Sequence, residues 1–181
     1  VTDQSWIRNL ELDGVNTGTG TIGLSIGNHA SIVLESVNID RLDVGLQIVS
    51  GQFNNASSCR IRACNVGMYV KSVAPAGGGN SWTFNDFILD QNKVGALFNG
   101  NSDYPFHSVV MRNCTAHNNA CAGIAAFNMQ QLILDAGAPE YTGTTDQLAT
   151  YTHDSVTAKQ ASVYLSASHC EVTNFYIAEA T

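Results

Sequence analysis

The chain has little charge, and little of that charge is positive. Charged residues make up 13% of its 181 residues, and eight basic residues stand against fifteen acidic ones, so the formal net charge is −7. Nucleic acids and anionic membranes attract basic surfaces, and this balance therefore argues against nucleic acid as a partner. No apolar run approaches the roughly 20 residues that a membrane-spanning helix needs, so we expect no membrane insertion.

Cysteine occurs in an odd number and without closely spaced pairs. The five cysteines are Cys59, Cys64, Cys114, Cys121 and Cys170. The odd number argues against a disulfide framework, and the spacing is unlike that of zinc-binding pairs. We expect the cysteines to pack as small apolar groups. The sequence indicates neither a metal site nor a cofactor.

A short phrase with glycine at its second position recurs along the chain. Its five copies are residues 22–26, 44–48, 66–70, 94–98 and 122–126, and their glycines are 22, 22, 28 and 28 residues apart. One copy is too short to bury an apolar face alone. The repetition therefore predicts a fixed supersecondary unit that stacks on a neighbour at each side.

Upstream of each glycine phrase, apolar residues alternate with other residues. A period of two indicates a β-strand with one buried face. The predicted inward-facing pairs are Leu10/Leu12, Val37/Ile39, Cys59/Ile61, Phe87/Leu89, Cys114/Ala116, Leu132/Leu134 and Phe175/Ile177. A further short strand is predicted before this one, with the inward pairs Ile32/Leu34, Trp82/Phe84, Val109/Met111, Phe127/Met129 and Cys170/Val172. Small polar residues such as Ser36 and Asn113 separate the two strands and predict a tight bend.

Three short strands per repeat predict an all-β solenoid. Residues 109–119, followed by Ala122-Gly123-Ile124, resemble the repeat of right-handed parallel β-helices of the pectin-lyase type, and the resemblance extends over about residues 5–178. It implies a right-handed, single-stranded parallel β-helix of about six coils, in one domain over residues 1–181. A β-sandwich or propeller is the alternative, but Asp13-Gly14 and Asn99-Gly100 do not join matched strands as its hairpins would. Since the chain starts at Val1 and enters its first repeat at once, we expect an excerpt of a longer protein.

Four insertions interrupt the repeat, at residues 14–21, 72–81, 99–107 and 136–160. Insertions in a solenoid gather on one side and often carry the function. The last insertion is the richest in polar and aromatic residues, so Tyr141, Tyr151 and His153 are predicted to bind substrate. A surface loop that only covers a neighbour or a subunit seam is the alternative.

The residue after each alternating strand is ionisable, and the register predicts one charged column: Asp13, Asp40, Arg62, Asp90, His117 and Asp135. Paired strands lie about 4.8 Å apart, so Asp90 and Asp135 are predicted about 10 Å apart with His117 between them. Such a separation is close to that of the two carboxylates of an inverting glycosidase. We therefore predict these three residues to be catalytic. Asp40 and the outward-facing Glu11 are predicted to bind substrate.

Two other interpretations of this region stay open. β-Elimination from a uronate needs cations beside the acidic sugar, and Arg60, Arg62 and Lys93 are the candidates. The same three cations are predicted to bind substrate in a hydrolase. Alternatively, Asp40, Arg62 and Asp90 form only a charge ladder between adjacent strands.

The low charge, the acidic balance and repeats rich in Asn, Ser, Thr and Gly make the chain resemble the shaft of a bacteriophage tailspike or a related polysaccharide depolymerase. The resemblance implies a homotrimer, on a virion tail or otherwise extracellular, that binds and degrades a bacterial surface polysaccharide by glycoside hydrolysis. A non-catalytic receptor-binding fibre segment is one alternative. A secreted pectin-lyase-like polysaccharide lyase or epimerase is another, because a fold does not decide a function.

Overall fold

The computed structural model describes residues 4–15, 18–27, 29, 31–73, 80–101, 103, 105–139, 148–166 and 168–175. These residues form strands joined by turns, and no helix occurs among them. The described part therefore holds no helix that could span a membrane.

Most strands belong to two parallel sheets. The larger sheet has ten strands, which are β1 (Ser5–Asp13), β3 (Ile32–Asp40), β5 (Gln52–Ser57), β6 (Arg60–Arg62), β8 (Asn80–Asn85), β9 (Ile88–Asp90), β11 (Val109–Arg112), β12 (Thr115–His117), β14 (Leu132–Pro139) and β18 (Cys170–Phe175). The smaller sheet has six strands, which are β2 (Ile22–Ile26), β4 (Val44–Val49), β7 (Val66–Lys71), β10 (Val94–Asn99), β13 (Ala122–Phe127) and β17 (Ala161–Ser166). The predicted all-β fold with parallel strand pairing is confirmed.

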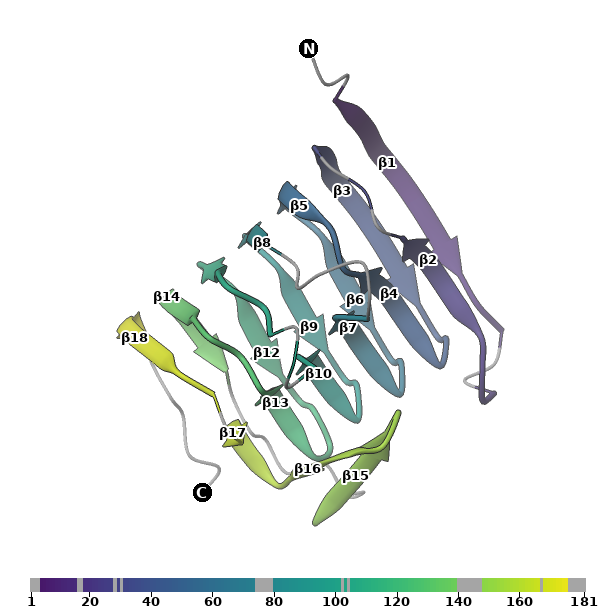
Figure 1. The fold of residues 1–181 in the computed structure, drawn as a ribbon. Helices are drawn as coiled ribbons and strands as arrows, with labels where there is room; N and C mark the ends of the chain where they lie inside the picture. The colour runs from purple at the N-terminus through teal and green to yellow at the C-terminus, as the bar shows by residue number, and fades with distance from the viewer. Residues whose placement is uncertain are drawn as a thin grey trace.

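Successive repeats lie side by side in the order of the sequence (Figure 1). The smaller sheet has the order β17-β13-β10-β7-β4-β2, and five of these strands are the glycine phrases. Its register keeps equivalent residues together, so that Val44, Val66, Val94 and Ala122 pair in succession. A residue that points outward in one repeat therefore has outward-pointing neighbours in the next.

The chain bends within each repeat at residues with positive φ. Along the larger sheet these are Asn9, Ser36, Ser58, Asp86, Asn113 and Ala136, with φ between 48° and 56°. Short polar side chains tolerate this conformation because they can bond the neighbouring backbone. The bends predicted at Ser36 and Asn113 are confirmed.

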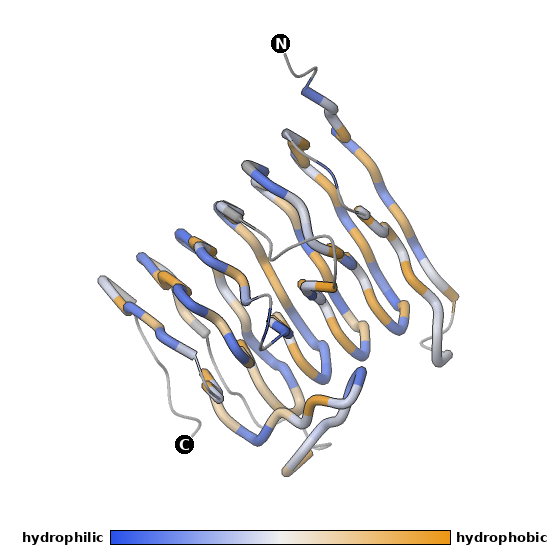
Figure 2. The backbone as a smooth tube through the Cα atoms, in the orientation of Figure 1, coloured by the Kyte–Doolittle hydropathy of each residue, from blue (hydrophilic) through white to orange (hydrophobic). Residues whose placement is uncertain are grey.

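Apolar side chains from both sheets form one continuous core. Trp82, Phe84, Phe87 and Leu89 are fully buried, which confirms the inward orientation predicted for them. The rings of Trp82 and Phe84 stack with centroids 5.4 Å apart, and Phe87 meets Phe84 edge-on at 5.4 Å. Figure 2 shows the alternation of hydrophobic and hydrophilic residues along the strands.

The cysteines are free, as predicted, and all but Cys170 are buried. Burial raises the pKa of Cys64 to about 11 and that of Cys114 to about 12. Because the thiolate is the reactive form, these two thiols are inert at neutral pH. They act as core residues.

The strand assignment around residue 130 was wrong. Leu132 and Leu134 pair with Val109 and Met111, so they belong to the first strand of their repeat and not to the second. Phe127 ends β13 and packs in a separate apolar cluster outside the main core. The sequence did not mark the bend here, because an alanine takes the positive φ that Asn, Asp or Ser takes elsewhere.

The insertion predicted at residues 136–160 begins later than expected. Residues 136–139 continue β14, and an antiparallel hairpin follows, formed by β15 (Thr150–His153) and β16 (Val156–Lys159). Tyr151 and Val156 of this hairpin pack against Val44, Tyr69 and Leu97 on the outer face of the smaller sheet. Most of the insertion predicted at 72–81 lies outside the described residues, and β8 already begins at Asn80.

Candidate functional site

Most of the predicted charged column is present on the larger sheet. The paired residues are Asp13–Asp40, Asp40–Arg62, Arg62–Asp90 and Asp90–His117. Each ends its strand just before a bend, so each stands above its counterpart in the next repeat. The register predicted for these five residues is confirmed.

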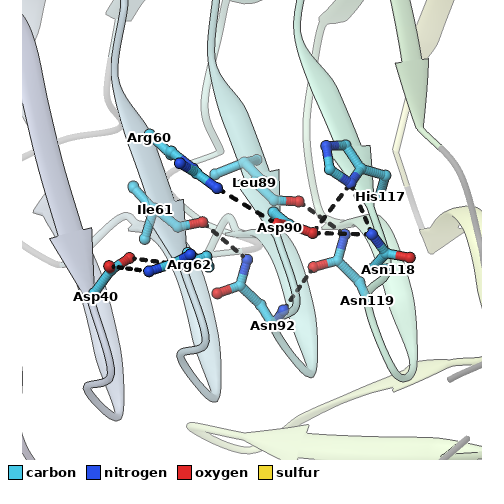
Figure 3. A network of polar contacts seen from close by, with 10 residues as sticks. All are labelled: Asp40, Arg60, Ile61, Arg62, Leu89, Asp90, Asn92, His117, Asn118 and Asn119. Carbon is cyan, nitrogen blue, oxygen red and sulfur yellow. Dashed lines mark hydrogen bonds and ion pairs between the residues drawn. The ribbon is translucent and has the colours of Figure 1, made fainter. Parts of the chain in front are cut away.

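Ion pairs neutralise the first part of the column (Figure 3). Arg62 donates from Nε to Asp40 Oδ1 at 3.2 Å and from Nη2 to Asp40 Oδ2 at 2.7 Å. These contacts raise the pKa of Arg62. Asp13 is paired with Arg41 through Nη2 alone, because Arg41 Nε donates to the carbonyl of Gly14. Here the geometry is that of a charge ladder between strands.

Asp90 and His117 form a more deeply buried contact. Asp90 is 5% exposed, and its Oδ1 lies 3.0 Å from His117 Nδ1 and accepts from Asn118 Nδ2 at 3.1 Å. Arg60 Nη2 lies 3.8 Å from the other carboxylate oxygen. Figure 3 shows the second ring nitrogen of His117 directed away from this network. A carboxylate that orients an imidazole in this way is also found beside general bases.

The predicted position of Asp135 in the column was wrong. Asp135 pairs in register with Arg112, whose Nε lies 3.5 Å from Asp135 Oδ2, and it accepts from Thr173 Oγ1 at 3.0 Å. β14 bends at Ala136, and Asp135 precedes this bend. The residues of the charged column come after the corresponding bend in their own repeats, at the end of the strand segment that follows it. The predicted carboxylate pair of Asp90 and Asp135 across His117 does not form.

The other predicted substrate-binding residues fall into two groups. Glu11 and Arg60 are exposed on the larger sheet, beside the column. Lys93, Tyr151 and His153 come together elsewhere, on the smaller sheet. Tyr141 lies outside the described residues.

A cleft of about 600 Å³ lies between part of the β15–β16 hairpin and the outer face of the smaller sheet. We call it the hairpin cleft. The sheet side contributes Asp43, Gln47, Asn65, Tyr69, Lys71 and Lys93, and the hairpin contributes Tyr151, Thr152, His153 and Asp154. Thr19 and Gly20, from the insertion predicted at 14–21, close one end. Sites for small molecules span about 300–1,000 Å³, so the hairpin cleft is of binding-site size.

The tip of the hairpin is held to β7 by one carboxylate. Asp154 Oδ2 accepts from Tyr69 Oη at 2.6 Å and from Lys71 Nζ at 2.9 Å. The ring of His153 meets that of Tyr69 edge-on at 4.7 Å, and Lys93 Nζ lies 5.4 Å from the centroid of the Tyr151 ring. These contacts place two tyrosines and two ammonium groups around the same space.

Asp43 forms a fixed acidic wall of the cleft. It is 5% exposed. Its carboxylate accepts from the backbone N–H of Gly20 at 2.6 Å and from Asn65 Nδ2 at 2.7 Å. Its own N–H donates to Thr21 Oγ1 at 2.9 Å. These hydrogen bonds hold the buried carboxylate in one orientation.

Burial sets the protonation states around the cleft. It raises the pKa of Tyr151 to about 12 and raises that of Tyr69 further, helped by the Asp154 carboxylate. It lowers the pKa of His153. The hydrogen bonds from Tyr69 and Lys71 lower the pKa of Asp154. At neutral pH the cleft therefore presents neutral phenols, a neutral imidazole and an ionised Asp154.

Acidification is expected to destabilise the protein through His153. Because its pKa is lower when folded, the unfolded chain takes up the proton first, and stability falls as the pH drops below about 6.5. The loss continues until the folded pKa is passed. Asp154 adds a loss in the same direction at lower pH, since its folded pKa is also depressed. Thermal denaturation of wild type and His153→Gln between pH 8 and 5 measures the effect.

The His153→Gln variant should show a smaller drop of Tm between these pH values than wild type. His169→Gln is the matched control, because the His169 side chain is 67% exposed. It should keep the wild-type pH dependence. Parallel curves for wild type and His153→Gln would contradict the prediction.

Several residues of the cleft were not predicted to bind substrate, among them Asp43, Tyr69 and Asp154. A signal for Tyr69 was present in the fourth residue of each glycine phrase, because Ser25, Gln47, Tyr69 and Leu97 pair in succession. This outward column is polar in the early repeats and apolar where the hairpin packs. Asp154 carried no such signal, since its partners are more than 80 residues away in the chain.

The comparisons with known proteins found no match. No family model matches the chain, and neither a curated protein nor a solved structure matches it. Among the described residues, no group of three His, Cys, Asp or Glu side chains is arranged to hold a metal ion.

Proposed function

We propose that the chain forms a right-handed, single-stranded parallel β-helix of the pectin-lyase type, with about six coils. Two observations support this. Pairings within both large sheets are parallel, and equivalent residues of the glycine phrases pair from repeat to repeat at sequence separations of 22 and 28.

We further propose that the protein binds a bacterial surface polysaccharide in the hairpin cleft, as the shaft of a tailspike does. The single observation that carries this is the composition of the cleft, where the Tyr151 ring lies beside Asp43, Gln47 and Lys93. Aromatic faces stack on the apolar faces of sugar rings, and fixed polar groups bond their hydroxyls. Assembly as a homotrimer and a place on a virion tail or otherwise outside the cell belong to the same proposal.

Replacing Tyr151 by alanine is expected to weaken polysaccharide binding about 5- to 30-fold. The loss of one stacked aromatic ring corresponds to about 1–2 kcal/mol. Binding of wild type and variant to capsular polysaccharide and lipopolysaccharide preparations measures it, for example by affinity electrophoresis. A thermal melt shows whether each variant is folded.

Tyr164→Ala is the matched control for this experiment. Tyr164 lies on the same outer face of the smaller sheet and packs against Phe127, with centroids 5.6 Å apart, but it does not line the cleft. Its replacement should leave affinity unchanged. If Tyr151→Ala binds as tightly as wild type, the glycan does not bind in the hairpin cleft.

Cleavage of the polysaccharide is a second proposed function. It is favoured by one observation, that a buried carboxylate, Asp43, and a neutral imidazole, His153, line the same cleft. A neutral imidazole can accept a proton, and a carboxylate can stabilise developing positive charge. New reducing ends in the binding mixtures indicate hydrolysis, and absorbance of unsaturated uronate indicates elimination. Binding without either product makes the protein a receptor-binding fibre segment.

A further inference from the structure

A second hollow of about 300 Å³ adjoins the hairpin cleft. Its walls include Ser72, Asn99 and Asn101, which follow the ends of β7 and β10 or lie in them. The two hollows share Lys71 and Asp154. The hydrogen-bonded contact between these side chains thus stands at the boundary between the two spaces.

Together the two hollows follow β7 from one end to the other. The hairpin cleft includes Asn65, directly before β7, and the second hollow includes Ser72, directly after it. A strand of this length covers about 20 Å at 3.3 Å per residue. A single sugar ring is much shorter than this distance, whereas a chain of several sugars can extend along it.

We infer that the two hollows are subsites of one groove, that the Asp154 carboxylate is a latch between them, and that the ligand is a glycan chain long enough to occupy both. The inference rests on the proposed polysaccharide binding. When the chain binds, Asp154 leaves Lys71 and Tyr69, whose ammonium and hydroxyl groups then donate to the glycan.

The contacts of Asp154 support this role. Its side chain is 47% exposed, so water competes for it and the contact with Lys71 is weak. Its own φ of 46° places it in the tight turn between the two hairpin strands. An exposed side chain at the tip of a hairpin can move away without disturbing the apolar packing of Tyr151 and Val156 on the sheet.

The experiment compares short and long oligosaccharides cut by partial acid hydrolysis from the polysaccharide preparation that binds the wild-type protein. Calorimetry measures the affinity of one repeating unit and of three or more. Wild type is expected to bind the long fragments at least about tenfold more tightly, because the second subsite is filled without a second loss of translational freedom. Equal affinity for both lengths would overturn the inference and leave the proposed function standing.

Asp154→Asn tests the latch. Asparagine tolerates positive φ, so the turn is retained. Loss of the carboxylate should raise the ratio of the affinity for long fragments to the affinity for short fragments about threefold. Weaker binding of long fragments by this variant would overturn the latch, because it would place Asp154 in contact with the glycan.

Glu35→Gln is the matched control, since Glu35 is 46% exposed and ion-paired with Arg8 on the larger sheet. It should bind both lengths as wild type does. A wild-type protein that binds none of the preparations would overturn the proposed function, and the inference with it. Length-independent binding overturns the inference alone.

Discussion

Replacing Gly95 by alanine is expected to lower the free energy of unfolding by about 3 kcal/mol. A Cβ atom on Gly95 would lie 2.5 Å from the carbonyl oxygen of Gly123 in the adjacent strand. Backbone cannot yield as a flexible side chain does, so the two strands must separate and weaken their shared hydrogen bonds. Thermal denaturation should show a fall in Tm of about 6–12 °C for a chain of this size.

Gly27→Ala is the control for this variant. A Cβ atom there meets nothing within 4 Å, and Gly27 has no positive φ. The substitution is expected to be neutral or to stabilise by up to about 1 kcal/mol, because alanine restricts the unfolded chain. If Gly95→Ala has the same Tm as Gly27→Ala, the close approach of the strands does not explain the glycine phrases.

The glycine phrases were predictable as a repeat but not in their cause. Cβ atoms on Gly23, Gly45 and Gly67 would lie 2.8, 2.7 and 2.6 Å from the carbonyl oxygen of the next glycine in the column. Each glycine is therefore required by the strand beside it. Spacing along the chain shows only that the unit repeats, because that neighbour is 22 or 28 residues away.

Inward-facing pairs of two apolar residues were predicted correctly in most repeats. Two exceptions are Phe127, which packs outside the main core, and Val172, which is 49% exposed. Inward-facing residues were also missed in β5, where Asn54 and Ala56 take the inward positions and are buried. Asn54 is accommodated because its Oδ1 accepts from the backbone N–H of Ile32 at 2.6 Å. A hydrophobic pattern cannot reveal a buried polar residue whose partner lies in another repeat.

The candidate site was predicted in part. Lys93, Tyr151 and His153 do lie together in the hairpin cleft, which is on the smaller sheet, whereas the charged column is on the larger sheet. Side-chain content was the reason to predict a functional insertion, and this stays a prediction. The position of the hairpin depends on its apolar packing against the cluster that includes Val44 and Leu97, which no local pattern encodes.

The charged column shows the opposite case, because its register was right for five residues but the predicted carboxylate pair of Asp90 and Asp135 does not form. Asp40 and Arg62 form a bidentate pair, so the carboxylate is already satisfied. Asp135, which was to complete the acid pair, belongs to another position of the repeat. A column of ionisable residues on a stacked sheet is therefore weak evidence for catalysis without a cavity beside it.

Replacing Asn92 by alanine is expected to lower the free energy of unfolding by about 2–4 kcal/mol. Asn92 is 1% exposed. Its Oδ1 accepts from the N–H of Cys64 at 3.0 Å. Its Nδ2 donates to the carbonyl of Ile61 at 3.3 Å (Figure 3). Alanine leaves the Cys64 N–H buried and unpaired, at about 1–3 kcal/mol. It also removes one hydrogen bond from the Ile61 carbonyl, which keeps its bond in the β6–β9 ladder, at about 1 kcal/mol. Urea denaturation measures the change as a lower midpoint at constant m-value.

Asn38→Ala is the matched control, because Asn38 is exposed in β3 and its replacement should change stability by less than about 0.5 kcal/mol. Asn119 repeats the Asn92 arrangement one repeat further on, accepting from Asn92 N–H at 3.0 Å and donating to the carbonyl of Leu89 at 3.1 Å. The two asparagines thus form a buried ladder, and the double variant should cost less than the sum of the single ones. If Asn92→Ala and Asn38→Ala have the same urea midpoint, the asparagine ladder does not stabilise the stacked repeats.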